Sequence, residues 1–333
     1  MKFTKRINRK IIAPILFNSK VTELINRFSC NSKLILNYHG IVKIFSPELS
    51  KNHLPIEEFE KQISYLKKKY SILPIEEIFK SKPSSKVIGI TFDDGYQNNL
   101  TNAFPVLKLH NVPATVFVTA QAIEKNSFPL WYDFFDISVS LIGWDRFKEI
   151  IDSNKLGISK FNGFNDYNLA KGQIKKSNGS FKLKFLDLLF NDDELHTSFL
   201  KANKEYWTLL NLTELQELSN SRLIEIGSHG LTHSNLEFQS DHELENELSK
   251  SKKVLENAIG TKISSIAFPD GSYNQNVMAK CKELGYERMY AVDYRNKSEK
   301  IDPNLFRRFS ISNTTTTESI LIQINLAFNN YGI

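Results

Sequence analysis

Short apolar runs alternate along this chain with longer segments in which apolar residues recur every three or four positions. Residues 34–38, 87–92 and 114–118 are rich in β-branched and other apolar residues, the pattern of buried strands. Between them, residues 55–70 and 98–110 carry apolar side chains at helical spacing. This alternation predicts an α/β fold with a parallel sheet, either open or closed into a barrel.

The alternation returns in the second half of the chain. Residues 241–259 form the clearest helical pattern, with apolar residues on one face and Gly260 at the end. A capping-box pattern of Thr213 with Gln216 predicts the start of another helix. The remaining elements expected here are strands at 223–227, 263–268, 289–292 and 309–312, and helices at 275–284 and from about residue 317.

Residues 125–210 interrupt the alternation. Residues 131–140 are aromatic and apolar, whereas residues 153–203 are rich in Lys, Asn and Asp with scattered aromatic residues. We interpret the segment as an insertion with helices of its own. The predicted organisation is therefore a basic segment at 1–32 and one barrel domain at 33–333 that the insertion interrupts.

Side chains able to perform chemistry follow four of the predicted strands: His39, the pair Asp93 and Asp94, His229, and residues 268–273. Adjacent carboxylates after a buried strand are hard to explain by folding alone, because successive strand residues face opposite ways. In a barrel the C-terminal ends of all strands converge on one face, whereas an open sheet spreads them apart. The positions of these residues therefore favour a barrel with one cavity.

Asp94, His229 and His233 have the composition of a catalytic metal site. Two imidazoles and one carboxylate are a common ligand set for zinc that leaves a position for water. Such a metal lowers the pKa of bound water from about 15.7 to about 7, and the adjacent Asp93 is the candidate general base. Support of a metal ligand and capping of the following turn are the alternative roles of Asp93, and a core position is the alternative for His233 alone.

His39 is the candidate general acid for a departing amine, although a lone histidine after a strand is more often structural. Trp131, Tyr132 and Trp207 are candidates for stacking on sugar rings, Trp131 foremost, although such aromatic residues more often lie in a core. The remaining histidines stand in polar or helical contexts and are expected at the surface: His53, His110, His196 and His242.

Positive charge is concentrated at the N-terminus. Residues 1–33 contain eight basic residues and one acidic residue, which exceeds the net charge of +6 for the whole chain. A solvated tail is the simpler interpretation, and contact with anionic lipid headgroups is the alternative. Nucleic acid is disfavoured as a partner because the rest of the chain is nearly neutral.

The sequence also bears on the compartment. Residues 11–17, the longest apolar stretch near the N-terminus, are at the lower limit for a signal-peptide core, and no segment approaches the roughly 20 apolar residues that cross a bilayer. Cys30 and Cys281 are the only cysteines, which fits a reducing compartment. We expect a cytoplasmic protein, with membrane contact through the basic segment and secretion as further alternatives.

Two motifs carry a family resemblance. Residues 91–95 (Thr-Phe-Asp-Asp-Gly) and 229–233 (His-Gly-Leu-Thr-His) closely resemble the polysaccharide deacetylases of the NodB-homology group, carbohydrate esterase family 4. The resemblance implies a distorted (β/α)7-type barrel that hydrolyses N- or O-acetyl groups on sugars with a divalent metal, for which Zn²⁺ is our expectation. The site residues that it implies are Asp94, His229 and His233 as metal ligands and Asp93 as base.

Tyr38-His39 and residues 268–273 resemble a subgroup that includes biofilm poly-N-acetylglucosamine deacetylases. In that subgroup an N-terminal histidine is the general acid, which here would be His39. This role is essential to the hypothesis, because the wider family uses a C-terminal histidine and none follows His242. The implied substrate and oxyanion residues are Pro269, Asp270 and Tyr273, with a backbone N–H near Asp270 as the oxyanion donor.

The chain departs from the family pattern at the proline motif. The family usually has an aromatic residue after the proline and often an arginine upstream, but here Asp270 follows Pro269 and no arginine precedes it. Arg307 or Arg308 is our candidate to orient Asp93 instead.

The sequence thus predicts a metal-dependent hydrolase that removes acetyl groups from N-acetylated sugars of a surface polysaccharide or its precursor. An acetylated sugar or glycan is the expected partner. Two alternatives stay open: a glycan-binding protein that has kept the fold without turnover, and a metal phosphoesterase, which commonly needs more ligands for two metals.

Overall fold

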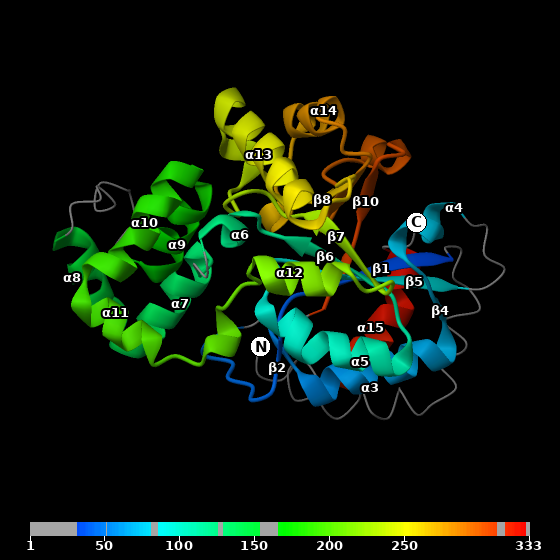
Figure 1. The fold of residues 1–333 in the computed structure, drawn as a ribbon, viewed down its shortest axis with the longest axis horizontal. Coiled ribbons are helices and arrows are strands. Elements are labelled where there is room, and N and C mark those ends of the chain that lie inside the picture. The colour runs from blue at the N-terminus through cyan, green and yellow to red at the C-terminus, as the bar shows by residue number, and fades with distance from the viewer. Residues whose placement is uncertain are drawn as a thin grey trace, which may run out of the picture.

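A rolled parallel sheet forms one part of the molecule, and a group of helices lies at one end of it (Figure 1). The computed structural model describes residues 32–50, 52–80, 86–125, 129–153, 166–311 and 317–330. Neighbouring strands of the sheet pair in parallel, in the order β10-β9-β8-β7-β6-β5-β1-β11. These strands are β1 (Lys33–Tyr38), β5 (Val87–Phe92), β6 (Ala114–Val118), β7 (Ile224–Ser228), β8 (Ser265–Ala267), β9 (Arg288–Ala291), β10 (Leu305–Arg307) and β11 (Phe309–Ser310).

The barrel closes through residues 305–310. β10 pairs with β9 at one edge of the sheet, β11 pairs with β1 at the other, and Arg308 is the residue between β10 and β11. The described strands follow one another around the barrel in chain order, and residues 305–310 take the seventh position. This arrangement confirms the predicted distorted (β/α)7-type barrel. Short strands outside this order are β4 (Ser71–Ile72), which pairs with β5, and the pair β2 (Ile41–Val42) and β3 (Leu54–Pro55).

Helices cover the outside of the barrel, each with an apolar face in the core that the strands share. α13 (Asp241–Ile259) shows the local signals clearly: Leu248 is buried, Ser240 caps the N-terminus, and Gly260 in the left-handed conformation ends the helix. The other helices of this layer are α3 (Ile56–Lys69), α5 (Phe104–His110), α12 (Leu212–Ser219), α14 (Gln275–Glu283) and α15 (Thr317–Asn330), with the shorter α6 (Gln121–Lys125) and η1 (Asn99–Ala103). The short helix α4 (Ile75–Lys80) instead contributes Ile75 to a separate cluster with Ile35, Phe117 and Tyr290.

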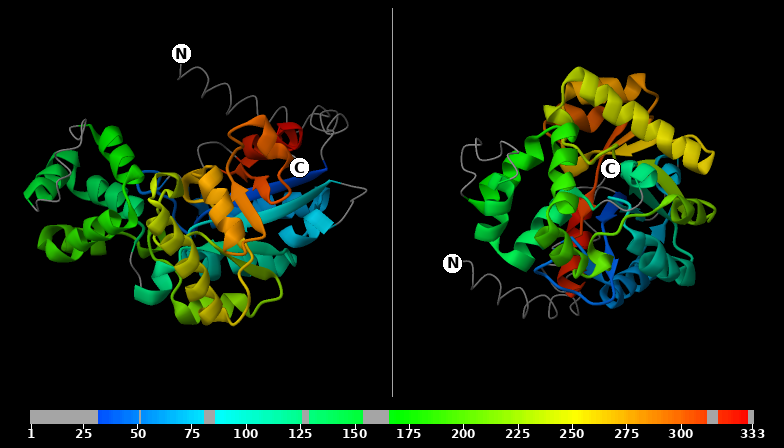
Figure 2. Two further views of the ribbon diagram at one scale, coloured as in Figure 1. Left: turned by 90° about the horizontal axis from the view of Figure 1, so that it is seen from above. Right: turned by 60° about the vertical axis from the view of Figure 1, so that its left-hand side comes forward.

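The helices that lie between α6 and α12 in the chain form a second hydrophobic core, rich in phenylalanine. Val42, which follows β1 in the chain, also belongs to this core and ties it to the barrel. The left view of Figure 2 shows these helices at one end of the barrel. They lie within the predicted insertion and are α7 (Trp131–Ile142), α8 (Trp144–Ser153), α9 (Tyr167–Lys176), α10 (Gly179–Asn191) and α11 (Asp193–Leu200).

The capping-box prediction for the helix near residue 213 was wrong by two positions. α12 begins at Leu212, and Asn211 is its cap, because its side chain accepts the backbone N–H of Glu214 and Glu214 accepts that of Asn211. Thr213 therefore lies inside the first turn. Asn and Thr are both good cap residues, so the sequence pattern alone did not separate the two positions.

Part of the predicted organisation lies outside the described residues. This applies to residues 1–31 of the basic segment, Cys30 included, and to residues 126–128 and 154–165 of the insertion. No helix in the described part of the chain combines the length and the apolar character needed to cross a membrane.

Candidate active site

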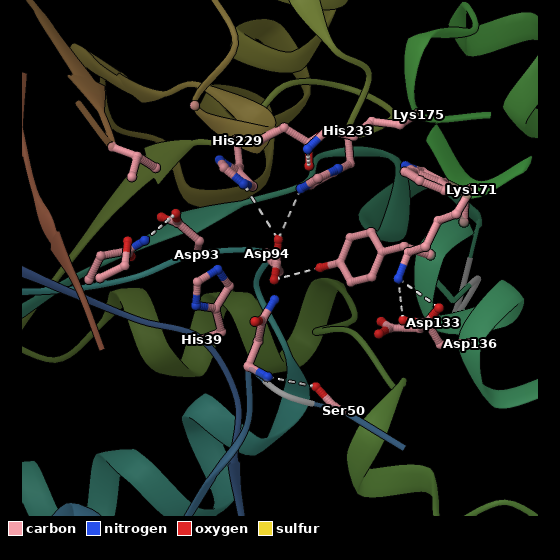
Figure 3. A pocket seen from close by; sticks show the side chains of 18 of the residues that line it. His39, Ser50, Asp93, Asp94, Asp133, Asp136, Lys171, Lys175, His229 and His233 are labelled. Atoms are coloured by element: carbon pink, nitrogen blue, oxygen red, sulfur yellow. Dashed lines mark hydrogen bonds and ion pairs between the residues drawn. The ribbon is translucent and has the colours of Figure 1, made fainter. Parts of the chain in front are cut away.

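A pocket of about 660 Å³ opens at the C-terminal ends of the strands, between the barrel and the helices α7 and α9 (Figure 3). Residues from distant parts of the chain meet in it because the strands of a barrel all end on one face. The predicted site residues in its lining are His39, Asp93, Asp94, Trp131, His229, His233 and Asp270.

Asp94, His229 and His233 converge on one point of this pocket. Asp94 Oδ1 lies 3.4 Å from His229 Nε2 and 3.2 Å from His233 Nε2, and the three ligand atoms lie within 4.8 Å of one another. Among the described residues, none donates a hydrogen bond to Oδ1, although this oxygen is buried. A divalent cation satisfies such an unpaired carboxylate oxygen that faces two imidazole nitrogens. The three residues therefore fit a metal site.

Neighbouring groups orient these ligand atoms. His229 Nδ1 lies 2.9 Å from the carbonyl oxygen of Ala267, so Nδ1 carries the proton and Nε2 keeps its lone pair for a metal. The hydroxyl of Tyr132 donates to the other Asp94 oxygen, Oδ2, over 2.7 Å. Burial disfavours the charged form of Asp94, but its contacts with the two imidazoles outweigh burial, and its pKa lies well below the ordinary value.

Glu247 holds the loop between the two histidines. It extends from α13 and accepts the backbone N–H groups of Leu231 and Thr232, each over 3.0 Å. His233 itself has a positive φ of 53°, so the loop must be held in a conformation that a β-carbon disfavours. The sequence reasoning missed Glu247. Its signal was a charged residue beside Leu248 on the face of α13 that the helical pattern buries.

Asp93 forms a bidentate ion pair with Arg308. Arg308 Nη1 and Nη2 donate to Oδ1 and Oδ2 over 2.6 and 2.8 Å, and Asn37 Nδ2 donates to Oδ2 over 2.9 Å. Burial opposes ionisation of Asp93, but the charge of Arg308 and the nearby imidazoles outweigh it, so the pKa of Asp93 lies below its ordinary value. Asp93 is therefore a carboxylate at neutral pH, the protonation state that a general base requires.

Closure of the barrel places Arg308 beside Asp93. Arg308 lies between β10 and β11, and its side chain is completely buried. Of the two candidates to orient Asp93, Arg308 is thus confirmed, while Arg307 pairs with Asp293 over 3.3 Å. Asn37, on β1, was not predicted, because nothing in its local sequence marks it.

Replacement of Arg308 by Met should destabilise the protein by about 3–5 kcal/mol, because it leaves the buried Asp93 carboxylate without its partner. Urea unfolding followed by circular dichroism measures this loss. Arg146→Met is the matched control, because Arg146 also forms a bidentate pair, with Glu194, but at the surface; it should leave stability close to wild type. Equal losses in the two variants would contradict the importance that we give to the buried pair.

His39 lies on the pocket wall beside the carboxylates (Figure 3). Asn99 Nδ2 donates to its backbone carbonyl over 2.8 Å and fixes the chain at this point. Among the described residues, none forms a hydrogen bond with the buried His39 Nδ1. The ring is therefore not committed to a structural contact through this nitrogen.

His53 was expected at the surface and is instead fully buried. Its ring packs against Tyr96 and Tyr206, with centroid distances of 4.6 and 5.0 Å, and its Nδ1 lies 2.7 Å from Ser50 Oγ. A β-carbon at Gly40 would lie 2.1 Å from the ring. The prediction was wrong because the aromatic residues that cover His53 are distant in the sequence.

The proline motif reaches the pocket only in part. Asp270 lines the pocket, and Lys175 of α9 forms an ion pair with its carboxylate over 3.0 Å. Tyr273 does not line it: the residue is fully buried, its hydroxyl donates to Glu299 over 2.6 Å, and its ring stacks on Phe268. The structure therefore does not bring the Tyr273 side chain into the pocket with the other predicted site residues. Pro269 is buried and also lies outside the lining.

Trp131 and Trp207 belong mainly to the core of the helical group. Trp131 touches the pocket but is only 2% exposed, which leaves little ring surface for a sugar. Trp207 lies outside the pocket lining. Of the three aromatic candidates, Tyr132 is the one whose polar atom has a hydrogen bond in the described structure, because its hydroxyl donates to Asp94 while the indole nitrogens of Trp131 and Trp207 have no hydrogen-bond partner there.

Comparison with known proteins adds the family. A family profile described as polysaccharide deacetylase matches residues 80–158 and 180–289, more than half of the chain. The matched stretches contain both the aspartate pair and the two histidines of the pocket. The chain belongs to the polysaccharide deacetylase family.

Two relatives within the family are similar over part of the chain. A poly-beta-1,6-N-acetyl-D-glucosamine N-deacetylase of Staphylococcus epidermidis is 33% identical over 118 residues, which cover 31% of this chain and 41% of the relative. A protein of the same name from Staphylococcus aureus is 29% identical over 118 residues, with the same coverage. The chain thus spans less than half the length of these relatives.

Two solved structures share the fold. Streptococcus pyogenes deacetylase PplD, in complex with acetate, has a TM-score of 0.56 at 19% identity, over 86% of this chain and 96% of that one. IcaB from Ammonifex degensii has a TM-score of 0.55 at 14% identity, over 90% of this chain and 98% of that one. These likenesses show that the distorted barrel is common to this family member and to both proteins.

Proposed function

We propose that this chain is a metal-dependent deacetylase that removes acetyl groups from N-acetylated sugars of a surface polysaccharide or its precursor. One observation carries the proposal: the imidazole nitrogens of His229 and His233 face an unpaired carboxylate oxygen of Asp94, and Asp93 lies in the same pocket. Family membership and the deacetylase names of the relatives support the same reaction.

Asp94 Oδ1 and the Nε2 atoms of His229 and His233 would hold the metal. Two imidazoles and one carboxylate favour Zn²⁺. When bound, such a metal supplies Lewis acidity toward the acetyl carbonyl and makes water more acidic.

The remaining steps belong to side chains of the pocket. Asp93, kept ionised and oriented by Arg308, accepts a proton from the attacking water. The backbone N–H of Asp270 stabilises the oxyanion. His39, which lines the pocket beside the carboxylates, protonates the departing amine.

The first test is acetate release from a panel of chitooligosaccharides, poly-β-1,6-N-acetylglucosamine and O-acetylated glycans, with metal content measured on the same sample. We expect acetate from N-acetylated sugars, one metal per chain and inhibition by a chelator. Sugar binding without acetate release would favour the glycan-binding alternative. Phosphate release with two metals per chain would favour the phosphoesterase, although the described residues contain only one metal-ligand cluster.

Replacement of His39 by Gln should lower amide hydrolysis by about 10²–10⁴-fold, the usual contribution of a general acid. The loss should be much smaller for an activated aryl acetate, because its leaving group departs without protonation. Parallel kcat measurements on an N-acetylated sugar and an aryl acetate give the comparison. Equal losses on both substrates would contradict an acid role and indicate a structural one.

A further inference from the structure

The helical group reaches the candidate metal ligands through Tyr132, the second residue of α7. The Tyr132 hydroxyl donates to Asp94 Oδ2 over 2.7 Å, whereas the two histidines face Oδ1. Its ring also packs edge-on against His233, with a centroid distance of 5.1 Å. One side chain from outside the barrel therefore contacts two of the three ligands.

Two more polar groups lie behind Tyr132 in a row. The hydroxyl oxygen of Tyr96 is 3.0 Å from that of Tyr132 and 2.8 Å from Asp133 Oδ2. Tyr96 and Asp133 are buried, and Figure 3 shows Asp133 on the side of Asp94 that faces away from Asp93. The row connects the metal-binding carboxylate to α7 through three consecutive hydrogen-bond distances.

The number of protons in this row is informative. Three oxygen–oxygen contacts need three protons, but the hydroxyls of Tyr132 and Tyr96 supply only two. Asp94 faces two imidazoles and is ionised, so it supplies none. If Asp133 were ionised, Tyr96 would donate to Asp133 Oδ2 and Tyr132 to Asp94, which leaves no proton for the contact between the two hydroxyls. If Asp133 carries the third proton, every contact has one donor, in the order Asp133 to Tyr96, Tyr96 to Tyr132 and Tyr132 to Asp94. Burial and the nearby charge of Asp94 raise the pKa of Asp133 well above its ordinary value, in agreement with this count.

We propose that Tyr132 is a positioning residue for the metal ligand Asp94, and that buried Asp133, as a neutral acid, orients Tyr132 through Tyr96. The role of the helical group is then to fix which Asp94 oxygen faces the metal. The proposal rests on the proposed function only for the identity of the metal ligands, and metal affinity tests it whether or not the chain releases acetate.

The test measures Zn²⁺ affinity of the full chain by competition with a chromophoric chelator. Tyr132→Phe should weaken binding by about 10–100-fold, the usual effect of removing a partner of a metal ligand. Asp133→Ala should weaken binding in the same direction. Asp133→Asn should retain wild-type affinity, because its amide N–H replaces the acid O–H as donor to Tyr96. Infrared difference spectra of wild type against Asp133→Asn should show the carbonyl stretch of a protonated acid.

Tyr206→Phe is the matched control. The Tyr206 hydroxyl also joins the helical region to the barrel, by donating to the Ile44 carbonyl over 2.9 Å, but in the described part of the chain no hydrogen bond connects this hydroxyl to Tyr132 or Asp94. The affinity of the Tyr206→Phe variant for Zn²⁺ should equal that of wild type. Wild-type affinity in Tyr132→Phe, equal weakening in Tyr206→Phe, or a carboxylate band in place of the acid band would each overturn the proposal. If Tyr132→Phe does not fold, the comparison of Asp133→Ala with Asp133→Asn decides.

Discussion

Replacement of Asp93 by Asn is expected to lower acetate release by about 10²–10⁴-fold while the chain still binds metal. The amide cannot accept a proton from water, but it keeps the size of the carboxylate and one oxygen for Arg308. The three proposed metal ligands are untouched. Turnover with an N-acetylated oligosaccharide and metal content per chain, measured on the same preparation, give the two quantities to compare.

A matched control follows β9. Asp293 forms an ion pair with Arg307 over 3.3 Å, but its side chain is exposed and lies outside the pocket lining. Asp293→Asn should therefore leave turnover unchanged. Normal turnover in Asp93→Asn would show that the base is another group. Loss of metal in that variant would show instead that Asp93 acts mainly by supporting the ligand Asp94.

Replacement of His233 by Ala is expected to remove both metal binding and turnover. A bound metal contributes several kcal/mol of transition-state stabilisation, which corresponds to a loss on the order of 10³-fold or more. Zn²⁺ should raise the melting temperature of the wild-type protein, because a ligand at 100 times its Kd stabilises the folded state by about 2.7 kcal/mol. The variant should show no such rise.

His242→Ala is the control for this experiment. His242 is an exposed residue of α13 and lies outside the pocket lining. The variant should respond to Zn²⁺ as the wild-type protein does. A full thermal response in His233→Ala, or equal loss of the response in both variants, would contradict a metal site built on His233.

Much of the barrel could be predicted because its signals are local. Residues 87–92 and 114–118 form strands with the predicted bounds, and α13 covers the predicted range. Each signal is contained in a few neighbouring residues: β-branched runs, helical spacing, and a glycine in the left-handed conformation at the helix end.

Contacts across the barrel were harder to predict. Which arginine would meet Asp93 could not be decided from sequence, because Arg307 and Arg308 are adjacent and only strand pairing sets the direction of each side chain. Glu247 and Asn37 were missed for a related reason. Their partners lie 16 and 56 positions away, so neither residue stands out in its own segment.

The sequence by itself determined the family motifs, the alternation of strands and helices, and the set of side chains at the strand ends. Tertiary structure decided how those side chains are held: Arg308 enters through closure of the barrel, and Tyr132 arrives from helices whose place the sequence did not reveal. The physical reason is the distance along the chain between the residues that interact. Backbone periodicity depends on neighbours along the chain, whereas hydrogen bonds to a buried carboxylate depend on which distant segments pack around it.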